Sequence, residues 1–154
     1  MAASDDVYDV ILDVLTSHAL SIGYFEFVNT HESKVSPGYG LTADIWADRF
    51  DPIRQSGLAA TSIRIIYMIR IRASLSQEPA DKIDSSMSRA AFTLIRTFMA
   101  NFELDGNARM VDVRGANNVP LSAQAGYIPT GDTKERIYDV TVPVLVNDMW
   151  DEAP

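Results

Sequence analysis

The chain of 154 residues contains no cysteine and only two histidines, which removes several classes of site at the outset. Without cysteine there is no disulfide framework and no thiolate metal site. A chain of this length buries about two thirds of the surface that its unfolded form exposes, which is enough for one hydrophobic core. We therefore expect a single domain over residues 1–154 that is stabilised by packing.

Basic residues and long hydrophobic runs are also scarce. Thirteen lysines and arginines stand against 21 aspartates and glutamates, so the formal charge is -8 and the surface as a whole repels nucleic acid. No uncharged run approaches the roughly 20 apolar residues of a membrane span, and residues 1–6 hold no basic segment that leads into an apolar one. We expect a soluble, untargeted protein that enters no membrane. Any contact with DNA would be passage without tight binding.

The most regular pattern of the chain lies between residues 57 and 79. Apolar residues recur at every second position and arginines fall between them, which is the period of a strand with one buried face. The apolar residues are Ile63, Ile65, Tyr67, Ile69 and Ile71, and the arginines are Arg64, Arg70 and Arg72. This pattern predicts a long central strand. Ser76, Glu78 and Pro79 follow it and predict the start of a helix that packs across the strand.

Two helices are predicted from apolar residues at helical spacing. The first begins at Ser4, whose hydroxyl can cap the first turn, and runs to about Ile22. The second follows Pro79 and ends near Asn101. Its apolar stripe consists of Ile83, Met87, Ala90, Ala91, Leu94, Ile95 and Phe98. The small alanine pair in this stripe allows a close approach to a sheet.

Alternating apolar residues predict further strands, separated by turn-forming segments rich in glycine, proline and asparagine. The strands are expected at residues 24–28, 41–48, 121–128 (a strand or an extended arm) and 137–146, and the connections at residues 29–40, 51–60, 115–120 and 129–132. The turn signal Asp105-Gly106-Asn107 predicts a hairpin between residues 102–104 and 109–113.

Pro143 interrupts the last of these strands. Because proline cannot donate a hydrogen bond to a sheet ladder, this strand is expected at an edge of the sheet or with a bulge. An apolar edge strand is also a place where another chain can add. The order of elements as a whole predicts an α+β fold, with a mixed, mostly antiparallel sheet and two helices packed on one face.

No catalytic constellation is found. His18 falls in a helical stripe, which favours a partly buried helix residue over a general base. His31 stands beside Glu32 but lacks the further ligands of an ordinary zinc site. Acidic pairs such as Asp9 with Asp13 fit a solvated helix face. We therefore predict a protein that is not an enzyme and that has no catalytic residue, no cofactor and no metal.

The arginine face of the central strand leaves two interpretations open. Since Ile66 and Met68 lie between the arginines, the face is neither plainly solvated nor plainly buried. It is either a solvated face with arginine stems lying over apolar neighbours, or an interface at which an acidic surface pairs with the guanidiniums. The two tryptophans allow the same two interpretations. The candidate interface residues are Trp46, Arg64, Met68, Arg70, Arg72, Tyr127, Pro143 and Trp150.

Several segments, taken in order, resemble a known family. They are HES (31–33), GYGLTADIWADRFDPI (38–53), GLAATSIRIIYMIRIRASLSQEPADKID (57–84), VPLSAQAGYI (119–128) and VTVPVLVNDMW (140–150). As an ordered set they look like the tail terminator family of long-tailed bacteriophages, in the form found in phages of actinobacteria. The likeness covers nearly the whole chain from residue 6 to residue 153, and none of its segments names a catalytic residue.

The resemblance implies a structural virion protein. Tail terminators are small α/β subunits that close into a six-fold ring on the head-proximal end of the tail tube, stop its polymerisation and dock to the head connector. The implied partners are further copies of the chain, the tail tube protein and the head-tail connector protein, while genomic DNA passes through the ring without specific binding. The implied location is the head-tail junction of the virion, reached from the host cytoplasm during assembly. No cofactor is implied.

Two other hypotheses stay open. The protein could instead be a neighbouring head-tail connector or a tail tube subunit, which copy number per virion would distinguish. From a different class, it could be a small-ligand or regulatory binding module that uses a pocket between the second helix and the sheet, an idea motivated by the mixed arginine and methionine face.

Overall fold

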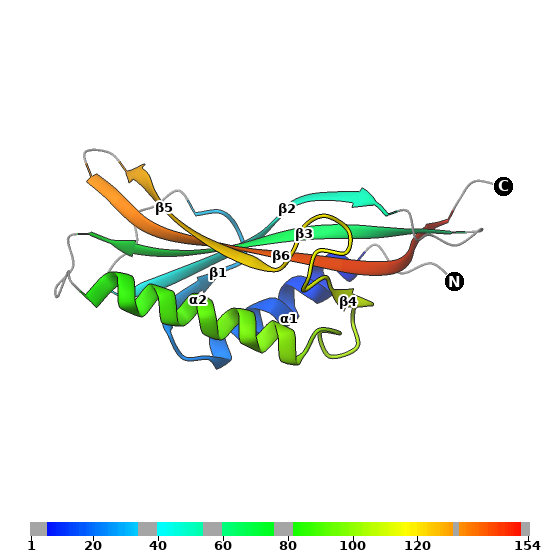
Figure 1. The fold of residues 1–154 in the computed structure, drawn as a ribbon, viewed down its shortest axis with the longest axis horizontal. Helices are drawn as coiled ribbons and strands as arrows, with labels where there is room; N and C mark the ends of the chain where they lie inside the picture. Colours follow the sequence, from blue (N-terminus) through cyan, green and yellow to red (C-terminus); the bar gives the residue numbers. More distant parts are fainter. Residues whose placement is uncertain (1–5, 34–39, 54–59, 76–81, 131–132, 152–154) are drawn as a thin grey trace.

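The computed structural model describes residues 6–33, 40–53, 60–75, 82–130 and 133–151 (Figure 1). Within these residues the fold is α+β, with two helices and one six-stranded sheet. In chain order the elements are α1 (Val7–Ser21), β1 (Phe25–Asn29), β2 (Leu41–Pro52), β3 (Ala60–Ser74), α2 (Ile83–Ala100), β4 (Met110–Val111), β5 (Ser122–Thr130) and β6 (Thr133–Asp151).

The sheet is mixed and mostly antiparallel, which confirms the predicted fold class. Its strand order is β1-β2-β3-β6-β4, and β5 also pairs with β6. The β1–β2 pair is parallel and the other pairs are antiparallel. The predicted central strand is confirmed as β3, whose 15 residues lie in the middle of this order, between β2 and β6.

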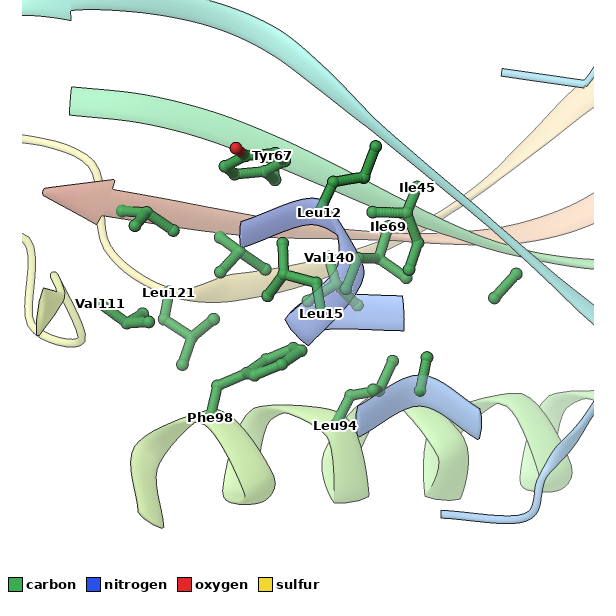
Figure 2. Close-up of a cluster of buried hydrophobic side chains, with 14 of the residues drawn as sticks. Leu12, Leu15, Ile45, Tyr67, Ile69, Leu94, Phe98, Val111, Leu121 and Val140 are labelled. Atoms are coloured by element: carbon green, nitrogen blue, oxygen red, sulfur yellow. The ribbon is translucent and has the colours of Figure 1, made fainter. Parts of the chain in front are cut away.

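Both helices cover the same face of the sheet, as predicted (Figure 1). The odd-numbered residues of β3 point toward them, so Tyr67 and Ile69 are fully buried against Leu15 of α1 and against Leu94 and Phe98 of α2 (Figure 2). Each fully buried aliphatic side chain of this kind contributes about 1.5–3 kcal/mol relative to exposure. The apolar alternation in the sequence therefore corresponds to one continuous core between the sheet and the helices.

The helix predictions agree closely with the structure. α2 spans Ile83–Ala100 and is capped by Asn101, where the sequence predicted its end. α1 ends at Ser21, and Gly23 follows with a φ of +76°, the left-handed conformation that glycine adopts without strain. The predicted cap at Ser4 lies outside the described residues.

β2 is longer than the sequence suggested. It continues to Pro52, so residues 51 and 52 belong to the strand and the prediction that they start a connection is wrong. The register between β2 and β3 shifts between Ala47 and Arg49, which is a bulge that admits one extra residue. A bulge breaks the alternation of side chains, and for this reason the far half of the strand could not be recognised by its period.

The predicted hairpin between residues 102–104 and 109–113 is wrong. Leu104 is instead fully buried in the core, in a turn where both Leu104 and Asp105 have positive φ angles. The following β4 pairs with β6, with Met110 opposite Leu145. The 19-residue β6 is long enough to pair with both β4 and β5 along the side that faces away from β3. A local turn signal does not reveal such a distant pairing partner.

Of the two alternatives predicted for the last strand, an edge position or a bulge, the edge position is wrong, because β6 lies inside the sheet. The carbonyl of Pro143 accepts a hydrogen bond from the Asp112 amide at 2.9 Å, so its ring nitrogen faces the same outer side and not β3. On that outer side β4 pairs with residues 144 and 145 of β6, and β5 pairs with residues 133–141. Pro143 lies between these two stretches, where the sheet needs no backbone N–H from β6. The irregularity in the β3–β6 register comes later, between Val146 and Trp150.

The remaining strand predictions hold with shifted ends. Residues 24–28 correspond to β1, and residues 121–128 form β5, a true strand that pairs with β6. Pro129, placed in a turn by the sequence, is part of β5 opposite Lys134. The remainder of that predicted turn, residues 131–132, lies outside the described residues.

Candidate interaction surfaces

In the described part of the chain no group of three or more histidine, aspartate or glutamate side chains is arranged to hold a metal ion. His18 is partly buried, as predicted: its Nε2 lies 2.9 Å from Asn101 Nδ2, and its ring meets the ring of Phe98 edge-on. His18 therefore joins α1 to the end of α2. His31 is exposed. Neither of the two described helices has the length and apolar character needed to cross a membrane.

The face of the sheet opposite the helices is built around arginine. Arg72 of β3 donates to Asp44 of β2 at 2.9 Å and to Glu135 of β6 at 2.7 Å, and all three side chains are buried. Burial opposes the charge of the guanidinium, but the hydrogen bonds to Glu135 and Asp44 outweigh it and raise the pKa of Arg72. This buried ion triad cross-links the three longest strands.

Arg64 binds a second carboxylate at the other end of the same face. Its Nε and Nη2 donate to both oxygens of Asp51 at 3.1 and 2.7 Å, and its Nη1 donates to the carbonyl of Asn117. The segment that carries Asn117, between β4 and β5, crosses the sheet here (Figure 1). Asp112 shapes that segment, since its carboxylate accepts the amides of Ala116 and Asn117 at 2.9 Å. Arg64 is buried beneath it.

The middle of this face is half exposed. Arg70 donates to both oxygens of Asp139 at 2.8 and 3.1 Å, and its guanidinium lies 5.4 Å from the centre of the Trp46 ring. The hydrogen bond to Asp139 is the main cause that raises the pKa of Arg70. Met68 lies opposite Trp46 in the ladder and accepts a contact from Thr141 Oγ1 at 3.6 Å. An apolar and cationic patch is thus left accessible to solvent.

The eight predicted interface residues fall into three groups. Arg64, Arg72 and Pro143 are buried within the chain, and Trp46, Met68 and Arg70 form the half-exposed patch. Tyr127 of β5 is 57% exposed and lies 4.5 Å from the Arg136 guanidinium, while Trp150 pairs with Thr61 through the backbone of β6. The acidic partners of the arginines come from this same chain. An interface role for these residues stays a prediction.

The sequence analysis left open a small-ligand pocket between α2 and the sheet. In the structure, side chains fill this space. Met87, Leu94 and Phe98 of α2 are fully buried there. A pocket of about 440 Å³ opens instead beside Arg64 on the other face, lined by Asp51, Pro52, Ile53, Ala116, Asn117 and Asn118. The predicted location of a ligand pocket is therefore wrong.

The outer faces of the two helices were not singled out by the sequence analysis. Phe92 of α2 is 74% exposed, and shallow hollows of about 270 and 230 Å³ lie on either side of it. Arg89 and Arg96 flank it one turn away in each direction. The outer face of α1 carries Asp9 and Asp13. The available signal was the stripe opposite the core stripe of α2, where Phe92 stands between two arginines at helical spacing.

No protein-family model matches the chain, and no curated protein sequence matches it. Among solved structures, the chain is similar to the PVC sheath/tube terminator of an extracellular contractile injection system in its extended state. The identity is 15% and the TM-score 0.41, and the match covers 96% of this chain and 58% of that one. The chain therefore spans less than two thirds of the length of that neighbour.

Proposed function

We propose that this protein is a structural subunit that terminates a phage tail: six copies form a ring on the head-proximal end of the tail tube, stop its polymerisation and dock to the head connector. The observation that carries the proposal is the spread of large exposed apolar side chains over separate elements. Phe27 on β1, Phe50 on β2 and Phe92 on α2 are 64%, 61% and 74% exposed. Exposed apolar residues on several sides suit a subunit with several neighbours.

The architecture supports a role based on shape. On the right-hand side of Figure 1, β3 and β6 run past both helices. The Asp44-Arg72-Glu135 triad ties these two strands together with β2. A long sheet that is cross-linked in this way is a stiff element with which one subunit can reach another. The ordered sequence resemblance to tail terminators supplies the specific assignment.

The charge of the chain suits the passage of DNA. A ring of subunits that each carry a net charge of -8 repels the phosphate backbone, so the genome moves through it without being held. The proposed partners are the tail tube protein, the head-tail connector and further copies of this chain. The proposed role involves no chemical step and no cofactor.

Deletion of the gene from the phage tests this proposal. Without a terminator, tube polymerisation is not stopped, so we expect tubes of uncontrolled length and capsids without tails in electron micrographs. Supplying the protein from a plasmid during infection should restore tails of normal length and their joining to capsids. Tails of normal length that join capsids in the absence of the protein would contradict the proposal.

A further inference from the structure

The outward stripe of α2 combines positive charge with apolar surface. Arg89, Phe92, Arg96 and Met99 follow one another at intervals of three or four residues and are all exposed. From residue 85 to residue 100 the only charged side chains of this helix are the two arginines. In a chain with a net charge of -8 this stripe is locally basic, and so it favours an acidic partner.

The outward stripe of α1 has the opposite charge. Asp9 and Asp13 are exposed on it, together with the apolar side chains of Val10 and Leu20. Residues 6–21 contain no lysine or arginine. Asp9 lies nine residues before His18, which is two and a half helical turns at about 3.6 residues per turn, so it points away from the side on which His18 contacts α2.

The two stripes do not satisfy each other within one chain. In the part of the chain that the structure describes, Arg89, Arg96, Asp9 and Asp13 form no ion pair. Arg64, Arg70 and Arg72, by contrast, are each paired with acidic residues of the same chain. The four helix charges named first are therefore available to another molecule, whereas the three arginines of the sheet face are committed.

The spacing of the two stripes also matches. Phe92 stands three residues after Arg89 and four before Arg96, and Val10 stands one residue after Asp9 and three before Asp13. When Phe92 is set beside Val10, each arginine lies within about one helical turn of Asp9 or Asp13 for either direction of the second helix. The contact would thus place an apolar pair between two pairs of opposite charges, the arrangement that gives an interface its specificity.

We infer that the Arg89-Phe92-Arg96 stripe of α2 binds the Asp9-Val10-Asp13 stripe of α1 in a second copy of this chain. The inference rests on the proposed function, since it identifies a surface through which copies would join. Because the two stripes differ, the contact is head-to-tail, and every copy keeps one free stripe for the next copy until the assembly closes.

Charge reversal with mixing tests the contact. The R89D/R96D variant and the D9R/D13R variant each bring like charges together, so each alone should lose at least about ten-fold in assembly. An equimolar mixture should regain the wild-type level, because each acidic α2 now meets a basic α1 and each basic α2 meets an acidic α1. Assembly is read as particle mass by sedimentation, and circular dichroism verifies folding. Lys134→Glu, at an exposed position of β6, is the control that should assemble like the wild type.

Cysteine cross-linking tests the same contact between concentrated free copies. Since the natural chain has no cysteine, F92C mixed with V10C offers one thiol on each copy, and we expect a disulfide-linked pair under mild oxidation. F92C mixed with F27C is the matched control with an exposed thiol elsewhere.

A mixture of charge variants that stays unassembled, or equal cross-linking in both cysteine pairs, would overturn the inference. If the charge mixture assembles into particles that are not six-membered, the helix contact stands and the six-fold ring of the proposed function fails. If phage lacking the gene produce normal tails while the mixture and the cross-link behave as expected, the contact stands without the terminator role.

Discussion

The two faces of the sheet are stabilised in different ways, although β3 contributes to both. Toward the helices it presents Tyr67, Ile69 and Ile71, all fully buried among apolar side chains. Toward the other side it presents Arg64 and Arg72, which are also buried but paired with carboxylates. The first face is stabilised by the removal of apolar surface from water, an effect that does not depend on the orientation of the contacting groups. The second depends on particular partners.

This difference assigns separate tasks to the two faces. Hydrophobic burial holds the helices on the sheet, whereas the ion pairs penalise a slip in strand register. A slip of β3 by one residue would turn Arg72 into the apolar core and remove its guanidinium from the buried carboxylates of Asp44 and Glu135. The arginine face therefore contributes to the specificity of the pairing among β2, β3 and β6, which the apolar face alone does not provide.

The largest effect is expected for Arg72→Met. The substitution leaves Asp44 and Glu135 buried without their guanidinium, which should lower the free energy of unfolding by about 3–5 kcal/mol. Urea denaturation measures the change. A loss below about 1 kcal/mol would show that the buried ion pairs do not stabilise the arginine face. The proposed difference between the two faces of the sheet would then be wrong.

Leu94→Ala makes the corresponding change on the apolar face. Leu94 is fully buried, so its truncation should cost about 2–5 kcal/mol, depending on how far the cavity collapses. The matched control is Ile95→Ala on the same helix, which is only partly buried and should cost less. Equal losses at the two positions, measured by thermal unfolding, would contradict the assigned core.

Tyr67 gives the apolar face a pH dependence. Burial, followed by the nearby Tyr8 and Asp9, raises the pKa of its phenol, and its hydroxyl donates to the Tyr8 carbonyl at 3.0 Å. The folded state then holds a proton that the unfolded state releases above about pH 10, so stability should fall there by about 1.4 kcal/mol per pH unit. Below pH 10 this contribution is fully present.

Tyr67→Phe sharpens this prediction. The variant should lose about 1 kcal/mol at pH 7 with the hydrogen bond to Tyr8, but its stability should decline less steeply above pH 10 than that of the wild type. The measurement is urea denaturation at a series of pH values. Parallel curves for the two proteins would show that Tyr67 does not titrate differently in the folded state.

The smallest effect is expected for Arg70→Met. Its pair with Asp139 is partly open to water, so the loss should stay below about 1 kcal/mol. Comparison with Arg72→Met isolates burial as the cause, because both arginines lie on one strand face and both bind carboxylates. A loss as large as that of Arg72→Met would show that exposure does not distinguish the two pairs.

The regular parts of the fold could be predicted because each residue there follows a local period. The alternation from Ile63 to Ile71 identified the central strand, and the stripe from Ile83 to Phe98 identified α2. Pro143 misled because the effect of a proline on a sheet depends on which side its nitrogen faces, and this is a property of the neighbouring strands.

The candidate surfaces could be predicted less well, for a related reason. Arg72 is 28 residues from Asp44 and 63 residues from Glu135, so no local pattern shows that both carboxylates meet it inside the chain. The outer helix stripes were visible in the sequence as exposed faces. That Asp9 and Arg89 have no ion-pairing partner among the described residues emerges only from the folded chain.

The number and position of copies in purified tails test the central claim most directly. Labelled protein, counted by single-molecule fluorescence and located by electron microscopy, should give six copies at the head-proximal end of each tube. Many copies along the tube, or a location on the capsid after heads and tails are separated, would contradict the proposal that this protein ends the tail.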